Sequence, residues 1–248
     1  MIKLLNVNFY RLKKSCTFWI CLVIMGLLGV FLYFNNYTPN CVGCTNQLGD
    51  VFFEYAVFNG FLIPIFVCIF VGSDYSNGTI RNKIISGQSK KNIYLSNLLT
   101  SIFVGSVYCL IYIICITITG IIFDNSFVIT FSKFIYILLD TLLLNISFCS
   151  LFNFIAMLID SKAISSVFSL SFTLWSLLIS NDIALKLSEA SGFKKIILQF
   201  VYDALPLSQS MQLYNLTDNY LKLAIYMIIT IILLNLFGII LFKHKELK

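Results

Sequence analysis

The sequence has few charged residues for its length. Charged side chains make up 11% of the 248 residues, whereas hydrophobic side chains make up 59%, and the mean hydropathy is +0.91. A soluble domain of this size could not bury so much apolar surface. The composition therefore excludes an ordinary soluble protein and predicts an integral membrane protein.

Signatures of catalysis and nucleotide binding are also absent. The sequence has no GxxxxGK[ST] loop, no GxSxG, no HExxH and no Cys and His pairs at zinc-like spacing. Its one histidine, His244, lies in the basic C-terminal tail, which argues against a Ser-His-Asp triad. We therefore expect no enzyme, no metal site and no cofactor in this chain. The net charge of +6 follows membrane topology and does not indicate nucleic-acid binding.

Six apolar segments approach or reach the length needed to cross a bilayer as helices. They are Thr17–Phe34, Val51–Gly72, Leu98–Phe123, Phe131–Ile159, Ser165–Ser180 and Tyr220–Phe242. The fifth is short and rich in serine, which leaves open whether it crosses completely. The predicted fold class is an all-α integral membrane protein with six transmembrane helices.

Basic residues are unevenly distributed between the two sides of this plan. With the N-terminus inside, twelve of the 17 Lys and Arg residues are cytoplasmic, as is typical of membrane proteins. The twelve are Lys3, Arg11, Lys13, Lys14, Arg81, Lys83, Lys90, Lys91, Lys162, Lys243, Lys245 and Lys248. Both termini are therefore expected inside. No internal repeat or linker is evident, so residues 1–248 are expected to form one membrane domain.

The first 16 residues have the pattern of an amphipathic helix. One face is predicted to hold Ile2, Leu5, Phe9, Leu12 and Cys16, and the other Lys3, Asn6, Tyr10, Lys13 and Lys14. Such a helix lies in the membrane interface. The alternative is a signal peptide, which the length of Thr17–Phe34 and the lack of a small-residue cleavage site disfavour.

A polar stretch over residues 73–97 separates the second and third segments. Asn77-Gly78 predicts a turn and Thr79–Ser86 about two helical turns, with Ile80 and Ile84 on one side. Gly87 suits a left-handed residue that ends a helix, and Ser89 suits the cap of the next one. From the residues alone, a solvated basic loop remains an equal alternative.

This stretch resembles the first intracellular loop of ABC-2 type permeases, the membrane subunits of ATP-binding-cassette exporters. The resemblance is carried by Asp74, Gly78-Thr79-Ile80-Arg81, Ser89-Lys90 and Ile93-Tyr94-Leu95. Family members usually have Glu or Asp at the first position and Arg at the position of Lys90. The similarity includes exporter permeases for bacitracin, lantibiotics and phenol-soluble modulins.

The resemblance implies a coupling helix that binds a groove of a separate ATPase. The residues implied in coupling are Asp74, Gly78, Thr79, Ile80, Arg81, Lys83, Ile84 and Gly87. Ile80 and Ile84 are expected to contact the ATPase, Arg81 and Lys83 to lie at the rim, and Asp74 to order the loop. ATP and Mg would bind the ATPase and not this chain.

The family further implies an assembly of two permeases and two ATPases in the bacterial cytoplasmic membrane. Its cargo would be hydrophobic or amphipathic, such as an antimicrobial or cytolytic peptide or a lipophilic antibiotic. The second and fifth helices would line the pathway, with the residues Phe52, Phe53, Glu54, Phe58 and Trp175. Lipid contact is the competing role for these aromatic residues.

The segment 181–219 is long for an outer connection. Phe193, Ile196 and Phe200 share one face of a predicted helix with Ile197 and Val201, and Pro206 ends it. The segment is expected to lie on the outer leaflet or to re-enter the membrane; the family resemblance implies re-entrant helices here.

Two cysteines, Cys41 and Cys44, lie in the first outer loop and could form a disulfide. A metal site would need further ligands that are not nearby in the sequence. Asp140 falls inside the fourth apolar segment, where a charge marks either a pathway or a helix-packing contact. The alternative functions are a stand-alone secondary transporter or channel, or, with less support, a membrane enzyme.

Overall fold

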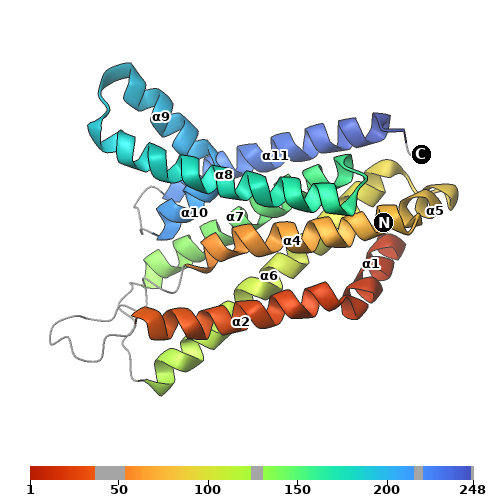
Figure 1. Cartoon of the computed structure of the whole chain (residues 1–248), viewed down its shortest axis with the longest axis horizontal. Helices are drawn as coiled ribbons and strands as arrows, with labels where there is room; N and C mark the ends of the chain where they lie inside the picture. The colour runs from red at the N-terminus through yellow and green to blue at the C-terminus, as the bar shows by residue number, and fades with distance from the viewer. Residues whose placement is uncertain (37–53, 124–130, 215–219, 247–248) are drawn as a thin grey trace.

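The computed structural model describes residues 1–36, 54–123, 131–214 and 220–246, and every regular element among these residues is a helix. Figure 1 shows the long helices running side by side along one axis. The helices are α1 (Ile2–Lys14), α2 (Cys16–Asn36), α4 (Tyr55–Ser76), α5 (Thr79–Ile85), α6 (Lys90–Ile122), α7 (Phe131–Leu158), α8 (Lys162–Glu189), α9 (Gly192–Ala204), α10 (Pro206–Tyr214) and α11 (Tyr220–His244). The predicted all-α class is confirmed.

Six of the described helices are long and apolar enough to cross a membrane, and these are α2, α4, α6, α7, α8 and α11. Each corresponds to one of the predicted segments. Helices suit a bilayer because they satisfy their backbone hydrogen bonds internally, where no water is present to do so.

The fifth predicted segment was drawn too short. Helix α8 runs over 28 residues, from Lys162 to Glu189. Its hydroxyl groups do not prevent a crossing, because they donate to carbonyl groups one turn earlier in the same helix. Thr173 Oγ1 lies 2.8 Å from the Ser169 carbonyl oxygen, and Ser180 Oγ lies 2.6 Å from that of Ser176.

The polar stretch 73–97 is also less of a loop than predicted. Helix α4 continues to Ser76, and α6 begins at Lys90. Asp74 therefore belongs to the last turn of α4. The connection between the two long helices consists of residues 77–89, which include the short helix α5.

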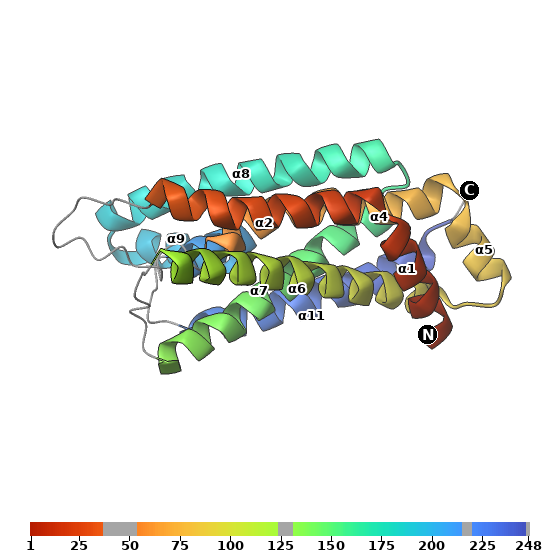
Figure 2. The ribbon, with the colours of Figure 1, turned by 90° about the horizontal axis from the view of Figure 1, so that it is seen from below.

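Helices α4 and α7 form the centre of the bundle. In each, 67% of the most apolar stretch is buried inside the protein, against 17% in α11. Helix α4 packs against α2, α6, α7, α8 and α10, and α7 also packs against α11. Figure 2 shows α2 and α8 on one side of the bundle and α11 on the other.

A proline in α4 explains one contact between α4 and α8. Pro64 has no backbone N–H, so the carbonyl group of Gly60, four residues earlier, loses its helical partner. The Thr173 hydroxyl of α8 reaches this carbonyl oxygen at 3.5 Å. In an apolar environment, such a side-chain donor compensates a helix break.

Helix α1 lies across one end of the bundle at a steep angle to α2 (Figure 1). Its buried residues are Leu4, Asn8 and Leu12, and it packs against α6. The predicted apolar face was therefore partly wrong, because Ile2 is 76% exposed whereas the polar Asn8 is fully buried.

Helices α9 and α10 lie at the opposite end from α1 and α5 (Figure 1). Pro206 is the first residue of α10 rather than a simple end of α9. Helix α10 packs against α4, α7 and α8. The predicted apolar face of α9 is exposed, and its members are Phe193, Ile196, Ile197, Phe200 and Val201.

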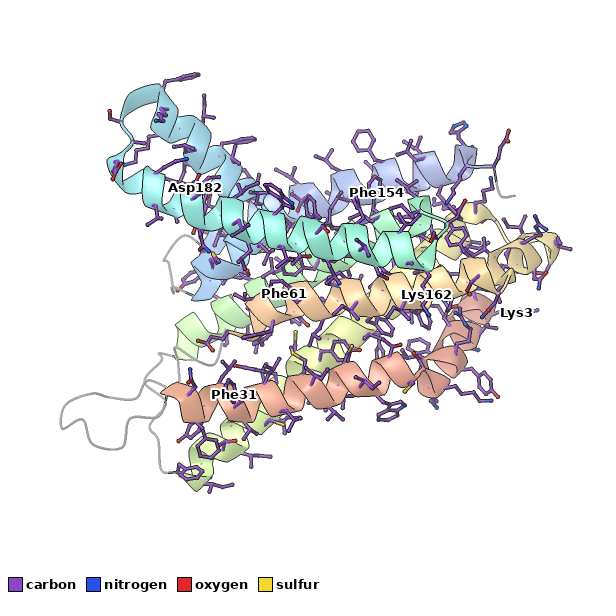
Figure 3. The ribbon with its side chains drawn as sticks, viewed as in Figure 1. Lys3, Phe31, Phe61, Phe154, Lys162 and Asp182 are labelled. Carbon is purple, nitrogen blue, oxygen red and sulfur yellow. The ribbon has the colours of Figure 1, made fainter. Side chains whose placement is uncertain are left out.

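The N-terminus, α5 and the end of α11 lie together at one end of the bundle (Figure 1). Figure 3 places Lys3 and Lys162 at this end and Asp182 at the other. Six long helices run alternately up and down the bundle, so the first and the last of them have their outer ends on the same side. The separation of the ends agrees with the predicted loop plan, in which residues near Lys3, Arg81 and Lys162 share one side.

Glycine permits close contact between α4 and α8. A Cβ atom on Gly72 would lie 2.8 Å from Cα of Lys162, so a backbone would have to move. We expect Gly72→Ala to lower the free energy of unfolding by about 1–3 kcal/mol. Thermal unfolding in one detergent measures this.

Gly26→Ala is the matched control. Its Cβ atom would meet Cys115 and Ile111 at an ordinary 3.5 Å, and alanine favours the helix by about 1 kcal/mol. This variant is expected to be unchanged or more stable. Equal destabilisation of both variants would contradict the packing argument.

Candidate functional site

The short helix α5 is delimited by two glycines with left-handed backbones. Gly78 has a φ of 66° and precedes α5, and Gly87 has a φ of 81° and follows it. The Ser89 side chain accepts a hydrogen bond from the Asn92 amide at 3.3 Å and caps α6. The predicted turn, short helix, helix end and cap are all confirmed. In both Figure 1 and Figure 2, α5 is the outermost element at its end.

Asp74 is the centre of a buried ion cluster beneath α5. Its side chain is fully buried, and its Oδ1 lies 2.5 Å from Nη1 of Arg11. Its Oδ2 lies 3.1 Å from Nζ of Lys83 in α5, and the Thr79 hydroxyl donates to the same carboxylate. A buried carboxylate needs such partners, because its desolvation is otherwise very costly.

The cluster continues as a chain of polar contacts toward α6. Lys83 Nζ donates to Asn8 Oδ1 of α1 at 3.2 Å. Asn8 Nδ2 donates in turn to Asn97 Oδ1 at 2.9 Å and to Thr100 Oγ1 at 3.4 Å, both in α6. Side chains from α1, α4, α5 and α6 thus form one network. The network attaches α5 to three other helices. Packing alone would hold a helix of seven residues only weakly.

Burial lowers the pKa of the Lys83 ammonium from its ordinary value, and the carboxylate of Asp74 opposes this shift. Lys83 is 8% exposed, so water contributes little to its solvation. The charge of Lys83 therefore depends on Asp74.

The inner and outer faces of α5 differ from the prediction. Ile80 is 2% exposed and packs into the core, and Ile84 packs against the core as a partly buried residue. Lys83 is buried against Asp74 and does not lie at a rim. The apolar side of a short helix that lies over a bundle turns inward, and this is the physical reason for the correction. The exposed face holds Arg81, Asn82 and Ile85, of which Ile85 is 77% exposed.

A second cluster at the same end attaches the C-terminal tail. Lys245 Nζ donates to the carbonyl oxygens of Met157 and Leu158 at 3.0 and 2.9 Å, and it pairs with Asp160. These carbonyls end α7 and have no partner within the helix. The same ammonium lies 4.5 Å from the ring centroid of Tyr75 in α4. It thus joins the ends of α4, α7 and α11.

The roles of Arg11, Asn8 and Lys245 in these clusters were not predicted from the sequence. Arg11 and Asn8 both fall within the predicted membrane-interface helix. One signal was available: Leu4, Asn8 and Leu12 are spaced by four residues and so share a helix face. Nothing local in the sequence connects Lys245 with α7.

The predicted pathway residues that the structure describes lie on different surfaces of the bundle. Trp175 is 67% exposed on the outer face of α8, whereas Phe58 packs against the core from α4. Glu54 is half-buried at the N-cap position of α4. Phe52 and Phe53 lie outside the described residues.

The described residues hold no group of three or more His, Cys, Asp or Glu side chains that could bind a metal ion. Six described cysteines are free thiols. Cys41 and Cys44, the predicted disulfide pair, lie outside the described residues. Asp140 is 5% exposed within α7.

No model of a known protein family matches the chain, and no curated protein matches it.

The ion cluster makes a prediction about α5. Asp74→Asn leaves the charges of Arg11 and Lys83 without their counter-charge, and breaking a buried pair costs about 3–5 kcal/mol. We expect lower thermal stability and faster hydrogen exchange in α1 and α5, measured by mass spectrometry.

Asp182→Asn is the control for the loss of an acidic charge. Asp182 pairs with Lys186 on the surface of α8, with side chains 60% and 55% exposed, and such pairs contribute below about 1 kcal/mol. Equal effects of the two variants, or unchanged exchange in α5 of Asp74→Asn, would contradict the assigned role of Asp74.

Proposed function

We propose that this protein is the permease subunit of an ATP-driven exporter of the ABC-2 type, with α5 as its coupling helix. The observation that carries the proposal is that α5 lies at the outer surface of one end of the bundle and is firmly attached there. It is the outermost element at one end of the bundle (Figure 1). Its Lys83 pairs with Asp74 of α4, which also pairs with Arg11 of α1. A helix that transmits force from a partner must be attached firmly to the helices that it moves.

The exposed face of α5 suits a protein partner. Ile85 offers a large apolar side chain, and Arg81 lies four residues before it on the same side. Apolar anchors bordered by arginine are typical of protein interfaces. Since the sequence has no ATP-binding loop of its own, the partner would supply ATP, Mg and hydrolysis.

The distribution of charge supports a cytoplasmic position for the α5 end. Lys3 and Lys162 lie there, as do α5, which contains Arg81, and the end of α11 (Figure 1). Cytoplasmic segments carry excess Lys and Arg. Helix α1 would then lie in the inner interface. The exposed apolar face of α9 would contact the outer leaflet, and α10 would be a re-entrant segment of the bacterial cytoplasmic membrane.

Two copies of this chain, or one copy and a close paralogue, would enclose the pathway with two ATPases beneath. The exposed apolar face of α8, which includes Trp175, Leu178 and Phe168, is suited to contact the second copy or an amphipathic cargo. A hydrophobic or amphipathic peptide or a lipophilic antibiotic fits such a surface, since apolar burial would drive its binding.

A stand-alone secondary transporter is the second candidate. The observation in its favour is Asp140, a carboxylate that is 5% exposed within a spanning helix. Intramembrane carboxylates often mark ion pathways. Transport that persists without any ATPase and is lost in Asp140→Asn would favour this candidate.

The orientation has a direct test. Single cysteines introduced at Ser86 and Ser191 into a chain without its native cysteines lie at opposite ends of the bundle, and both positions are exposed. A membrane-impermeant maleimide applied to intact cells should label position 191 only, and both positions after lysis. Labelling of position 86 alone in intact cells would reverse the proposed orientation.

The coupling role predicts that α5 contacts an ATPase. A photoreactive amino acid at position 85 should crosslink in native membranes to a protein with a GxxxxGK[ST] loop, identified by mass spectrometry. Ile85→Asp should weaken copurification of this ATPase by about 30-fold, as expected for loss of a central anchor of about 2 kcal/mol. Arg81→Glu should have a smaller, salt-dependent effect.

Matched controls carry the same changes at the other end of the bundle. Leu185, in α8, is 73% exposed, so Leu185→Asp controls for a new charge on an exposed aliphatic residue. Lys194→Glu controls for charge reversal on exposed α9. If Ile85→Asp retains full ATPase binding in a folded protein, or if position 85 crosslinks no ATPase, α5 is not a coupling helix.

A further inference from the structure

A pocket lies between α1, the start of α2 and the end of α4. Its volume is about 310 Å³. Its lining residues are Tyr10, Arg11, Lys14, Ser15, Thr17, Ile69, Phe70, Ser73 and Asn77. Two of these are cationic and none is acidic.

The cations of the pocket are held in place by neighbouring groups. The Arg11 guanidinium lies 4.6 Å from the ring centroid of Phe70 and donates to Ser73 Oγ at 3.0 Å. The Lys14 ammonium lies 4.5 Å from the ring centroid of Tyr10. Behind the pocket, Asp74 neutralises only one of its two partners, Arg11 and Lys83. The region therefore keeps an excess positive charge, which favours an anion.

The pocket lies at one end of two helices that are long and apolar enough to cross a membrane. It adjoins the first residues of the spanning helix α2 and the last turn of the spanning helix α4. Tyr10, which lines the pocket, is 61% exposed. Trp19, whose indole N–H donates to the Lys13 carbonyl oxygen at 3.1 Å, is 53% exposed. Trp and Tyr side chains are enriched at membrane interfaces. Ile69 and Phe70 form an apolar wall on the side of the spanning helices, where an acyl chain would lie.

From this arrangement, we propose that the pocket binds the phosphate-bearing headgroup of an anionic phospholipid. Arg11 and Lys14 would bind the phosphate, the hydroxyl groups of Ser15 and Thr17 would donate to headgroup oxygens, and Ile69 and Phe70 would contact the acyl chain. A soluble compound could also supply the phosphate, but two features favour a lipid. These are the apolar wall and the position of the pocket at one end of α2 and α4. This proposal is independent of the transport function.

Quenching of Trp19 fluorescence by brominated lipids tests the proposal in the full chain. The sequence has 2 Trp residues, so Trp175→Phe leaves Trp19 as the single reporter. The protein is reconstituted in phosphatidylcholine bilayers with phosphatidylglycerol, and either lipid carries the bromine. We expect phosphatidylglycerol to be preferred about tenfold near Trp19, and Lys14→Gln to reduce this preference about fivefold, as expected for one cation at an anionic surface.

Lys13→Gln is the matched control, because Lys13 is an exposed neighbour that does not line the pocket. It should reduce the preference less than Lys14→Gln does, because its side chain does not line the pocket. Equal losses for the two variants would mean a diffuse surface charge and no pocket site. Absence of any preference for phosphatidylglycerol would also overturn the proposal. Displacement of the lipid by millimolar inorganic phosphate would assign the pocket to a soluble phosphate compound instead.

Discussion

The buried carboxylate of Asp74 is the interaction on which one end of this protein depends. It lies in the last turn of α4, and its partners come from α1 and α5. An unpaired charge in such a position would be too costly to retain, so the carboxylate requires Arg11 and Lys83 to be in place. Conversely, Lys83 is buried only because Asp74 compensates its charge. The positions of the two short helices and of the long helix α4 are therefore determined together.

In a bilayer, the ordinary driving force for packing the bundle would be absent, since lipid is as apolar as the helix surfaces. Close approach and polar contacts take its place. Gly72 allows α8 to approach α4, and Asn145 Nδ2 of α7 donates to Ser106 Oγ of α6 at 3.3 Å. Asn235 Nδ2 of α11 similarly donates to Ser150 Oγ at 3.0 Å. Such contacts explain how helices with largely apolar surfaces pack in one arrangement.

Features with local causes could be predicted from the sequence. The turn at Asn77-Gly78, the end at Gly87 and the cap at Ser89 each depend on a few neighbouring residues, and the six spans depend on hydropathy alone. The length of α8 was missed because hydropathy counts serine as polar, although its hydroxyl can bond the preceding turn of its own helix. The partners of Asp74 were missed because pairing between distant segments has no local signal.

The orientation of α5 affects how a partner could bind it. An amphipathic helix of seven residues was expected to turn its apolar side toward a partner, but Ile80 is buried in the protein itself. The outward face is consequently more polar, and only Ile85 offers much apolar area there. A partner would therefore bind a helix that is already folded and attached, so little ordering entropy would be lost on association.

Arg11 connects the ion cluster with the pocket, because it contacts Asp74 and also lines the pocket between α1 and α4. An anion bound in that pocket would act on the same guanidinium that holds Asp74. By linkage, occupancy of the pocket and the attachment of α5 would influence each other equally.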